Sequence, residues 1–183
     1  MQPMRVFLDM DGVLADFVGG VHRVHGRPNC YDNPSNLGRF DIEACWGVSA
    51  EEFWEPTDTF EFWNGLDKMP DADAFVDFVC GEFLTSNVAV LTAPSKACAC
   101  FTGKRAWIER YYPQFKRRII YGTAKDFLAG PNRILIDDRD RNVEEFAEHG
   151  GIGILVPRPW NSAYHVTIEP LAAVKQALLA LQD

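Results

Sequence analysis

The chain has 183 residues, of which 26 are acidic and 18 are basic, so its formal net charge is −8. This length suits one domain that carries a modest insertion, and a hydrophobic share of 47% excludes a disordered chain. The sequence has no run of eighteen apolar residues, so we expect no membrane-spanning helix. The acidic balance disfavours binding along a nucleic-acid backbone, although a bound cation would still allow a small phosphorylated ligand.

The first residues of the sequence and its cysteines indicate the cellular compartment. The apolar run before Asp9 is too short for the core of a signal peptide. The five cysteines form an odd set without a CxxC pair, which favours free thiols. We therefore expect a cytoplasmic protein.

Short apolar runs alternate with longer helical stretches along the chain. Buried parallel strands read as continuous apolar runs, and the expected strands cover residues 5–8, 88–91, 118–121, 134–136 and 152–156. The expected helices cover residues 71–83, 95–112, 142–149 and 170–181. This alternation predicts an α/β fold with a parallel sheet flanked by helices.

Local signals set several helix ends. Asp71 is the expected N-cap of the helix over residues 71–83. Pro113 is expected to end the helix over residues 95–112. Thr123 and Asp126 have the spacing of a capping box, which predicts a further helix start.

The stretch between Phe17 and Met69 breaks this rhythm. It contains no evident strand, prolines punctuate it, and aromatic residues gather in its second half. We interpret it as a mostly helical insertion that sits over the sheet. Most of its aromatic side chains are expected to form a small second core, with one or two facing a ligand.

Polar side chains follow the predicted strands. Asp9 and Asp11 come after the first strand, Thr92 after the second, and Asp137 with Asp138 after the fourth, while Lys125 follows the third. A lone Asp-x-Asp-Gly is a weak signal, because Asp and Gly are ordinary turn residues. The carboxyl ends of parallel strands meet at one sheet edge, where open α/β sheets bind their ligands. The combined set therefore predicts one site.

Several carboxylates at one point repel each other unless a cation lies between them, and ligands that offer only oxygen favour Mg²⁺. The Thr92 hydroxyl and the Lys125 ammonium would hold the remaining oxygens of a phosphoryl group. One carboxylate is then free to act as a nucleophile, and the one two residues further on can exchange a proton with the leaving group and with water. The pattern thus favours phosphoryl transfer.

The motifs resemble those of a known superfamily. The run Asp9-Met10-Asp11-Gly12-Val13-Leu14-Ala15-Asp16-Phe17 is similar to the first motif of the haloacid dehalogenase (HAD) superfamily, and in particular to that of the 5′(3′)-deoxyribonucleotidases. Residues 91–94 resemble their second motif, Lys125 the third and residues 136–139 the fourth. The motif order agrees, and the resemblance spans the whole chain.

The resemblance implies a Rossmannoid HAD-like core, formed by residues 1–16 and 70–183, with a small helical cap over residues 17–69. It implies a phosphoric monoester hydrolase that acts on deoxyribonucleoside monophosphates through an aspartyl-phosphate. Asp9 would be the nucleophile and Asp11 the general acid and base. The Mg²⁺ ligands would be Asp9, the backbone carbonyl of Asp11 and Asp138, with Asp137 in a supporting role.

The resemblance also implies substrate contacts. Thr92, Lys125 and Lys96 would bind the phosphoryl group. Phe17 matches an aromatic residue that lies against the nucleobase, and Phe40, Asp41 and Ile42 fall near the cap segment that contacts the base. Ala93 departs from the family, which often has serine there, and so removes one hydrogen bond to phosphate.

The sequence leaves alternatives open. The same chemistry could serve another small phosphomonoester such as a sugar phosphate, or the chain could bind nucleotides without turning them over. A basic band that includes Lys104 and Arg105 is interpreted as a solvated helix face and strand approach, with nucleic-acid binding disfavoured by the net charge. Whether the chain forms a homodimer stays open.

Overall fold

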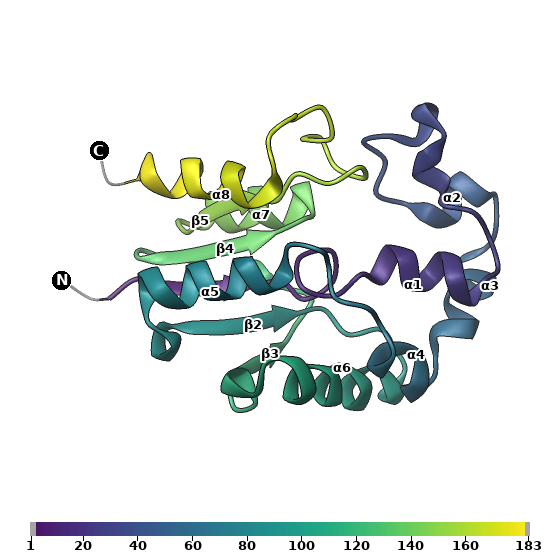
Figure 1. Ribbon diagram of the computed structural model, residues 1–183, viewed down its shortest axis with the longest axis horizontal. Coiled ribbons are helices and arrows are strands. Elements are labelled where there is room, and N and C mark those ends of the chain that lie inside the picture. The colour runs from purple at the N-terminus through teal and green to yellow at the C-terminus, as the bar shows by residue number, and fades with distance from the viewer. Residues whose placement is uncertain (1–2, 182–183) are drawn as a thin grey trace.

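A parallel sheet of five strands, in the order β3-β2-β1-β4-β5, forms the centre of the protein (Figure 1). The computed structural model describes residues 3–181. The strands are β1 (Arg5–Leu8), β2 (Val88–Thr92), β3 (Ile119–Tyr121), β4 (Arg133–Asp137) and β5 (Ile152–Leu155). All neighbouring strands pair in parallel, and every predicted strand is confirmed to within one residue at each end.

Successive residues of the central strand β1 point to opposite faces of the sheet, as a period of two requires. Val6 and Leu8 belong to the larger buried cluster, and Phe7 between them belongs to the smaller one. Both faces are covered by helices, which explains why residues 6–8 form a continuous apolar run. Polar side chains stand at the ends of this run, where Arg5 is exposed before it and Asp9 follows it.

Four longer helices flank the sheet: α5 (Ala72–Phe83), α6 (Cys98–Tyr111), α7 (Asp140–Glu148) and α8 (Pro170–Leu179). α5 and α8 place buried residues in the larger cluster, and α7 places Phe146 in the smaller one, so they cover opposite faces. The expected helices are confirmed, but α6 begins three residues later than predicted. Asp71 is the N-cap of α5, yet its carboxylate makes no capping bond and accepts instead from Arg158.

The predicted capping box at Thr123 and Asp126 is wrong. This segment forms the 3₁₀ helix η6 (Lys125–Leu128), whose N-cap is Ala124 and makes no side-chain capping bond. The segment is too short for an α-helix to propagate, because Gly130, at φ 151°, and Pro131 come only two and three residues after Leu128. Lys125 turns into the sheet edge rather than along a helix surface, since it is 3% exposed.

The segment between β1 and α5 is helical and contributes no strand to the sheet in the described part of the chain, as predicted. Its α-helices are α1 (Phe17–Val24), α2 (Ile42–Trp46), α3 (Ala50–Trp54) and α4 (Phe60–Asn64), joined partly by 3₁₀ turns. Figure 1 shows these helices beyond the carboxyl ends of the strands. The division into a core and a cap at residues 17–69 stays a prediction, because buried residues of both segments share one cluster.

A close contact joins this helical segment to the rest of the protein. α4 packs against α6 at Gly103, where a Cβ atom would lie 2.5 Å from the Trp63 Cβ. About one turn further along α6, the Trp107 indole donates a 2.7 Å hydrogen bond to the Leu66 carbonyl. Glycine thus allows the two backbones to approach each other, and α4 is fixed beside the sheet edge.

No helix among residues 3–181 is long and apolar enough to cross a membrane.

Candidate functional site

A pocket of about 790 Å³ lies at the carboxyl ends of the strands and is lined by residues that follow the strands and by residues of the helical segment. This volume falls within the usual range for small-molecule sites. Nine of the eleven residues predicted for the site line it. They are Asp9, Asp11, Phe17, Phe40, Asp41, Ile42, Lys96, Lys125 and Asp138. Thr92 and Asp137 themselves do not line the pocket; both are fully buried behind its wall.

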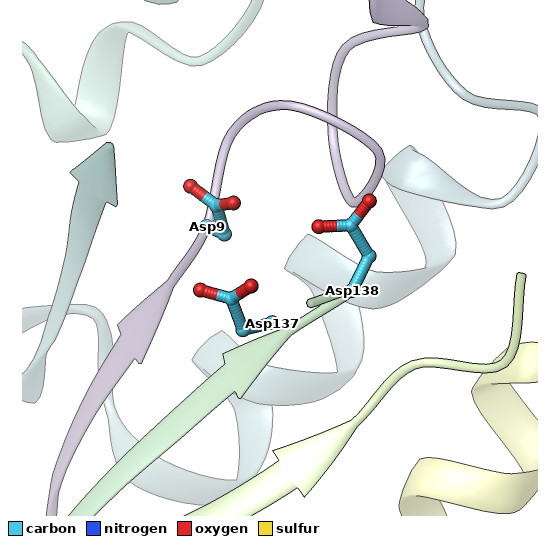
Figure 2. Close-up of side chains that lie close together, drawn as sticks. All are labelled: Asp9, Asp137 and Asp138. Atoms are coloured by element: carbon cyan, nitrogen blue, oxygen red, sulfur yellow. The ribbon is translucent and has the colours of Figure 1, made fainter. Parts of the chain in front are cut away.

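Three buried carboxylates meet at the sheet edge. Asp9 directly follows β1. Asp137 is the last residue of β4, and Asp138 directly follows that strand (Figure 2). One oxygen from each lies within 4.8 Å of the others. The parallel pairing of β1 with β4, in which Leu8 is opposite Ile136, brings these residues side by side. The predicted convergence of Asp9 and Asp138 is therefore present in the structure.

This arrangement is electrostatically costly without a cation. Burial is the main cause that raises the pKa of Asp9 to about 7, and the neighbouring Asp137 and Asp11 carboxylates add to it against the opposing charge of Lys125. Burial also raises the pKa of Asp138 well above its usual value, with repulsion from Asp137 and Asp9 adding to the effect. Both groups thus resist ionisation where no positive charge offsets them.

Lys125 supplies part of that positive charge. Its ammonium lies 2.8 Å from Asp9 Oδ1 and 2.6 Å from Asp137 Oδ2. Burial by itself would lower the pKa of Lys125, but the two carboxylates outweigh it and the pKa is raised, so the side chain stays charged. The single lysine cannot neutralise three carboxylates.

Asp137 is fully engaged with the protein. Oδ1 accepts from the Arg139 backbone N–H at 2.9 Å and from the Asn142 amide, and Oδ2 accepts from Lys125 and again from Asn142. These partners leave it little capacity for a further ligand.

Asp138 is held by the loop that follows β5. Trp160 Nε1 donates to its Oδ2 at 2.5 Å, and the Asn161 amide donates to its backbone carbonyl at 2.8 Å. Gly12, at φ 72°, lies against the same carboxylate, and a Cβ atom there would come within 1.9 Å of Oδ2. Glycine is thus required at this position both for the turn after Asp11 and for the space beside Asp138.

Asp11 is held by a residue that the sequence interpretation misjudged. Lys104 is fully buried rather than part of a solvated face. Its ammonium lies 2.5 Å from Asp11 Oδ2, 2.7 Å from Thr92 Oγ1 and 2.8 Å from the Ala93 carbonyl. The neighbouring basic residue Arg105 is exposed, as predicted, and pairs with Glu109. The interpretation of the basic band is therefore wrong for Lys104, because α6 turns that position toward the sheet edge.

The opposite wall of the pocket is aromatic. Phe17 stacks against Trp54 with ring centroids 5.9 Å apart and against Trp63 at 5.5 Å. Phe40 is 41% exposed, and the Arg139 guanidinium lies 4.6 Å from its ring centroid. Trp63 Nε1 is buried and has no hydrogen-bond partner in the described part of the chain. This wall offers flat apolar surface and one unused donor.

Sequence comparison matches the family described as 5′ nucleotidase, deoxy (pyrimidine), cytosolic type C protein over residues 2–179. The chain belongs to this type C 5′-nucleotidase family.

Curated 5′(3′)-deoxyribonucleotidases match this chain over a shorter alignment. The human mitochondrial 5′(3′)-deoxyribonucleotidase is 32% identical over 150 residues, which cover 74% of this chain and 62% of the relative. The human cytosolic-type 5′(3′)-deoxyribonucleotidase is 32% identical over 147 residues, which cover 75% of this chain and 71% of the relative. The chain therefore spans a little under two thirds of the mitochondrial relative's length.

Solved structures share the fold of this chain at low identity. A phosphonoacetaldehyde hydrolase-like protein from Oleispira antarctica matches 98% of this chain and 85% of its own with a TM-score of 0.52 and 13% identity. The L-2-haloacid dehalogenase from Xanthobacter autotrophicus matches 96% of this chain and 88% of its own with a TM-score of 0.51 and 12% identity. The HAD-like α/β fold is thus confirmed.

Sequence reasoning missed three residues that shape the site: Lys104, Arg158 and Trp160. Arg158 is buried, donates to the Gly12 carbonyl at 2.7 Å and pairs with Asp71. The spacing of Lys104 on α6 carried a signal, since it lies three residues before the apolar pair Trp107 and Ile108 on the same helix face. The loop after β5 carried none, because its course depends on tertiary contacts.

Proposed function

We propose that the chain is a Mg²⁺-dependent phosphatase that hydrolyses deoxyribonucleoside monophosphates through a phosphoryl group carried on Asp9. The observation that carries the proposal is the meeting of Asp9 with Asp138 and Lys125 at the floor of one pocket. Membership of the type C nucleotidase family and the names of its curated relatives support the choice of substrate.

The donor set fits a hard divalent cation. Asp9 and Asp138 offer carboxylate oxygens, and both have raised pKa values because their charges are buried without enough compensation. Asp9, Asp138 and the backbone carbonyl of Asp11 would hold Mg²⁺, while Asp137 orients Lys125 and the turn after β4. When bound, the ion would offset negative charge on the phosphoryl oxygens and lower the cost of ionising both carboxylates.

The chain's own residues then account for two proton-balanced steps. In the first, an Asp9 carboxylate oxygen bonds to phosphorus, the bond from phosphorus to the leaving oxygen breaks, and the Asp11 carboxyl gives that oxygen its proton. In the second, Asp11 takes a proton from water as the water oxygen attacks phosphorus, the bond to Asp9 breaks, and inorganic phosphate leaves. Lys125 and Lys96 hold phosphoryl oxygens during both steps, and Thr92 supports this wall from behind.

The helical segment would act as the cap, and its aromatic wall would hold the nucleobase. Phe17, flanked by Trp54 and Trp63, presents a flat apolar surface, and Phe40, Asp41 and Ile42 line the same end of the pocket. A base stacked there gains from apolar burial and from ring contacts. Residues 1–16 with 70–183 would then form the catalytic core and residues 17–69 the cap.

Replacing Asp9 with Asn tests the covalent mechanism. The variant removes the nucleophile and is expected to lower kcat for dUMP and dTMP by roughly 10⁴-fold or more, as losses of essential nucleophiles do. The matched control is Asp67→Asn, which changes an exposed aspartate paired with Arg23 and should leave kcat unaltered. Full hydrolysis by the Asp9 variant would refute the mechanism, and binding without turnover by the wild type would favour a non-catalytic module.

A panel of phosphomonoesters tests the substrate. Nucleotides that offer a base to the aromatic wall should show a higher kcat/KM than sugar phosphates of similar size. A preference for substrates that lack a base would replace the nucleotidase proposal with another phosphatase activity.

A further inference from the structure

Lys104 is a buried cation near the site that the proposed chemistry does not use. Its side chain is fully buried in α6 and does not line the pocket, so it cannot reach a bound phosphate as Lys96 or Lys125 can. Burying an ammonium is costly unless it is fully paired, which indicates that its contacts serve a purpose. Those contacts all lead to residues at the sheet edge.

Three acceptors surround the Lys104 ammonium: Asp11 Oδ2, Thr92 Oγ1 and the Ala93 carbonyl, at 2.5, 2.7 and 2.8 Å. An ammonium group has three N–H donors, and all three are therefore engaged. The lysine joins the turn after β1 to the end of β2. It also fixes the direction of the Asp11 carboxylate, because only Oδ2 is bonded.

The other Asp11 oxygen is left free. Oδ1 is buried and has no hydrogen-bond partner among residues 3–181, while Asp11 lines the pocket. The contact with Lys104 thus divides the carboxylate into one oxygen used for anchoring and one available to a ligand.

The helical segment also packs against Lys104. The Trp63 ring of α4 lies 4.9 Å from the Lys104 ammonium, and Gly103 beside it allows α4 to approach α6 closely. Trp63 also stacks against Phe17. Lys104 is therefore enclosed from both the sheet edge and the helical segment.

We propose that Lys104 is a positioning residue that holds the carboxyl group of Asp11 so that its free oxygen protonates the leaving group. The inference rests on the proposed phosphatase function. It assigns no contact between Lys104 and the substrate. Without Lys104, Asp11 loses its anchor and delivers its proton to the leaving oxygen less often.

Substrates with different leaving groups separate this role from a general structural one. A deoxyribonucleoside 5′-monophosphate releases a strongly basic alkoxide, which needs the proton from Asp11 as the bond breaks. p-Nitrophenyl phosphate releases a weakly basic phenolate, which needs no proton. Loss of acid positioning should slow only the first substrate, whereas a distorted site would slow both.

The experiment measures leaving-group release in single turnovers, with enzyme in excess, for Lys104→Met and for Lys104→Gln. Release of the nucleoside is expected to fall by about 30-fold or more, within the roughly 10²–10⁴-fold that a positioned acid supplies, and release of p-nitrophenol is expected to change little. The control Arg105→Met alters the exposed neighbour on the same helix and should change neither rate. Equal losses for both substrates, or no loss for the nucleotide, would overturn the inference.

If both Lys104 variants fail to fold, an NMR measurement tests the contact between Lys104 and Asp11 instead. In protein labelled with ¹⁵N at lysine side chains, a buried ammonium with three acceptors exchanges slowly and gives a resolved signal. One such signal is expected to move in Asp11→Asn, and its absence or constancy would contradict the contact. Wild-type protein that hydrolyses neither substrate would refute the proposed function while this signal still tests the pairing of Lys104 with Asp11.

Discussion

The two walls of the pocket differ in how firmly their side chains are held. On the sheet wall, Asp9, Asp11 and Asp138 each accept from a buried donor, namely Lys125, Lys104 and Trp160. On the helical wall, Phe40 is 41% exposed, the Asp41 side chain makes no capping bond, and Trp63 Nε1 has no partner in the described chain. Under the proposed function, the difference means that the groups proposed to react are preorganised, while the surface proposed to face the rest of the substrate is left to adapt.

Removing a cation from the sheet wall should have the largest effect. Lys125→Met loses the charge beside Asp9 and is expected to lower kcat by roughly 10²–10³-fold, as the loss of one preorganised donor typically does. Lys96→Met removes a pocket-lining lysine that makes no ion pair in the described structure, so it should raise KM more than it lowers kcat. Steady-state kinetics on both variants checks this. A Lys125→Met enzyme with unaltered kcat would contradict the comparison.

Trp160→Phe weakens the sheet wall without touching a reacting atom. It removes the indole donor to Asp138 Oδ2 and should weaken Mg²⁺ binding by about 10-fold or more, as changes to groups that orient metal ligands do. Calorimetric titration with Mg²⁺ measures the affinity directly. The matched control is Trp54→Phe on the helical wall, which should alter KM for the nucleotide and leave Mg²⁺ affinity as it was. Equal Mg²⁺ affinities in all three proteins would count against the role given to Trp160.

The pH dependence of the Mg²⁺ effect tests the charges on the sheet wall. The pKa of Asp9 is raised to about 7 from a usual value of 3.8, so the folded chain holds this proton where the unfolded chain does not. Without a cation, the contribution of Asp9 to stability is therefore present at low pH and is lost as the pH rises from about 4 to 7.

Protons should accordingly compete with Mg²⁺ at this carboxylate. One pH unit below a pKa of 7, Asp9 alone would weaken Mg²⁺ binding by about tenfold. The increase in Tm on adding Mg²⁺ is thus expected to be larger at pH 8 than at pH 6, as measured by thermal unfolding. An increase that is the same at both values, or larger at pH 6, would show that the carboxylates do not bind the ion.

The smallest effect is expected on the helical wall. Phe40→Ala removes the ring beneath the Arg139 guanidinium and part of the apolar lining, and should raise KM by about 2- to 5-fold, the equivalent of roughly 0.5–1 kcal/mol for an exposed contact of this kind. kcat should stay as in the wild type. The control Phe127→Ala alters a ring that is 85% exposed and lies outside the pocket lining, so neither constant should change.

The sheet wall was predictable from sequence because strand ends converge by rule. Asp9, Thr92 and Asp138 each follow an apolar run, and parallel pairing brings such positions to one edge whatever the intervening chain does. The motif resemblance then supplied roles for each residue. The same logic located Lys125, although the local structure around it is a 3₁₀ turn rather than a capped helix.

The supporting contacts were not predictable in the same way. Lys104 is basic within a basic band, and its burial follows only from the rotation of α6 and the approach of α4 at Gly103. Trp160 and Arg158 act from a loop whose path no local pattern fixes. On the helical wall, the motif resemblance did name Phe17, Phe40, Asp41 and Ile42, which line the pocket. The bounds of the short helices there were not predictable, since such helices depend on tertiary packing more than on intrinsic propensity.

A direct test of the central claim is to look for phosphorus on Asp9. Wild-type protein mixed with Mg²⁺ and a deoxyribonucleoside monophosphate, then quenched in acid within one turnover, can be digested and mapped by mass spectrometry. The account predicts one phosphoryl group on the peptide that contains Asp9, absent from the Asp9→Asn variant. Turnover with no labelled peptide in quenches that span a full cycle, or with the label on another residue, would contradict it.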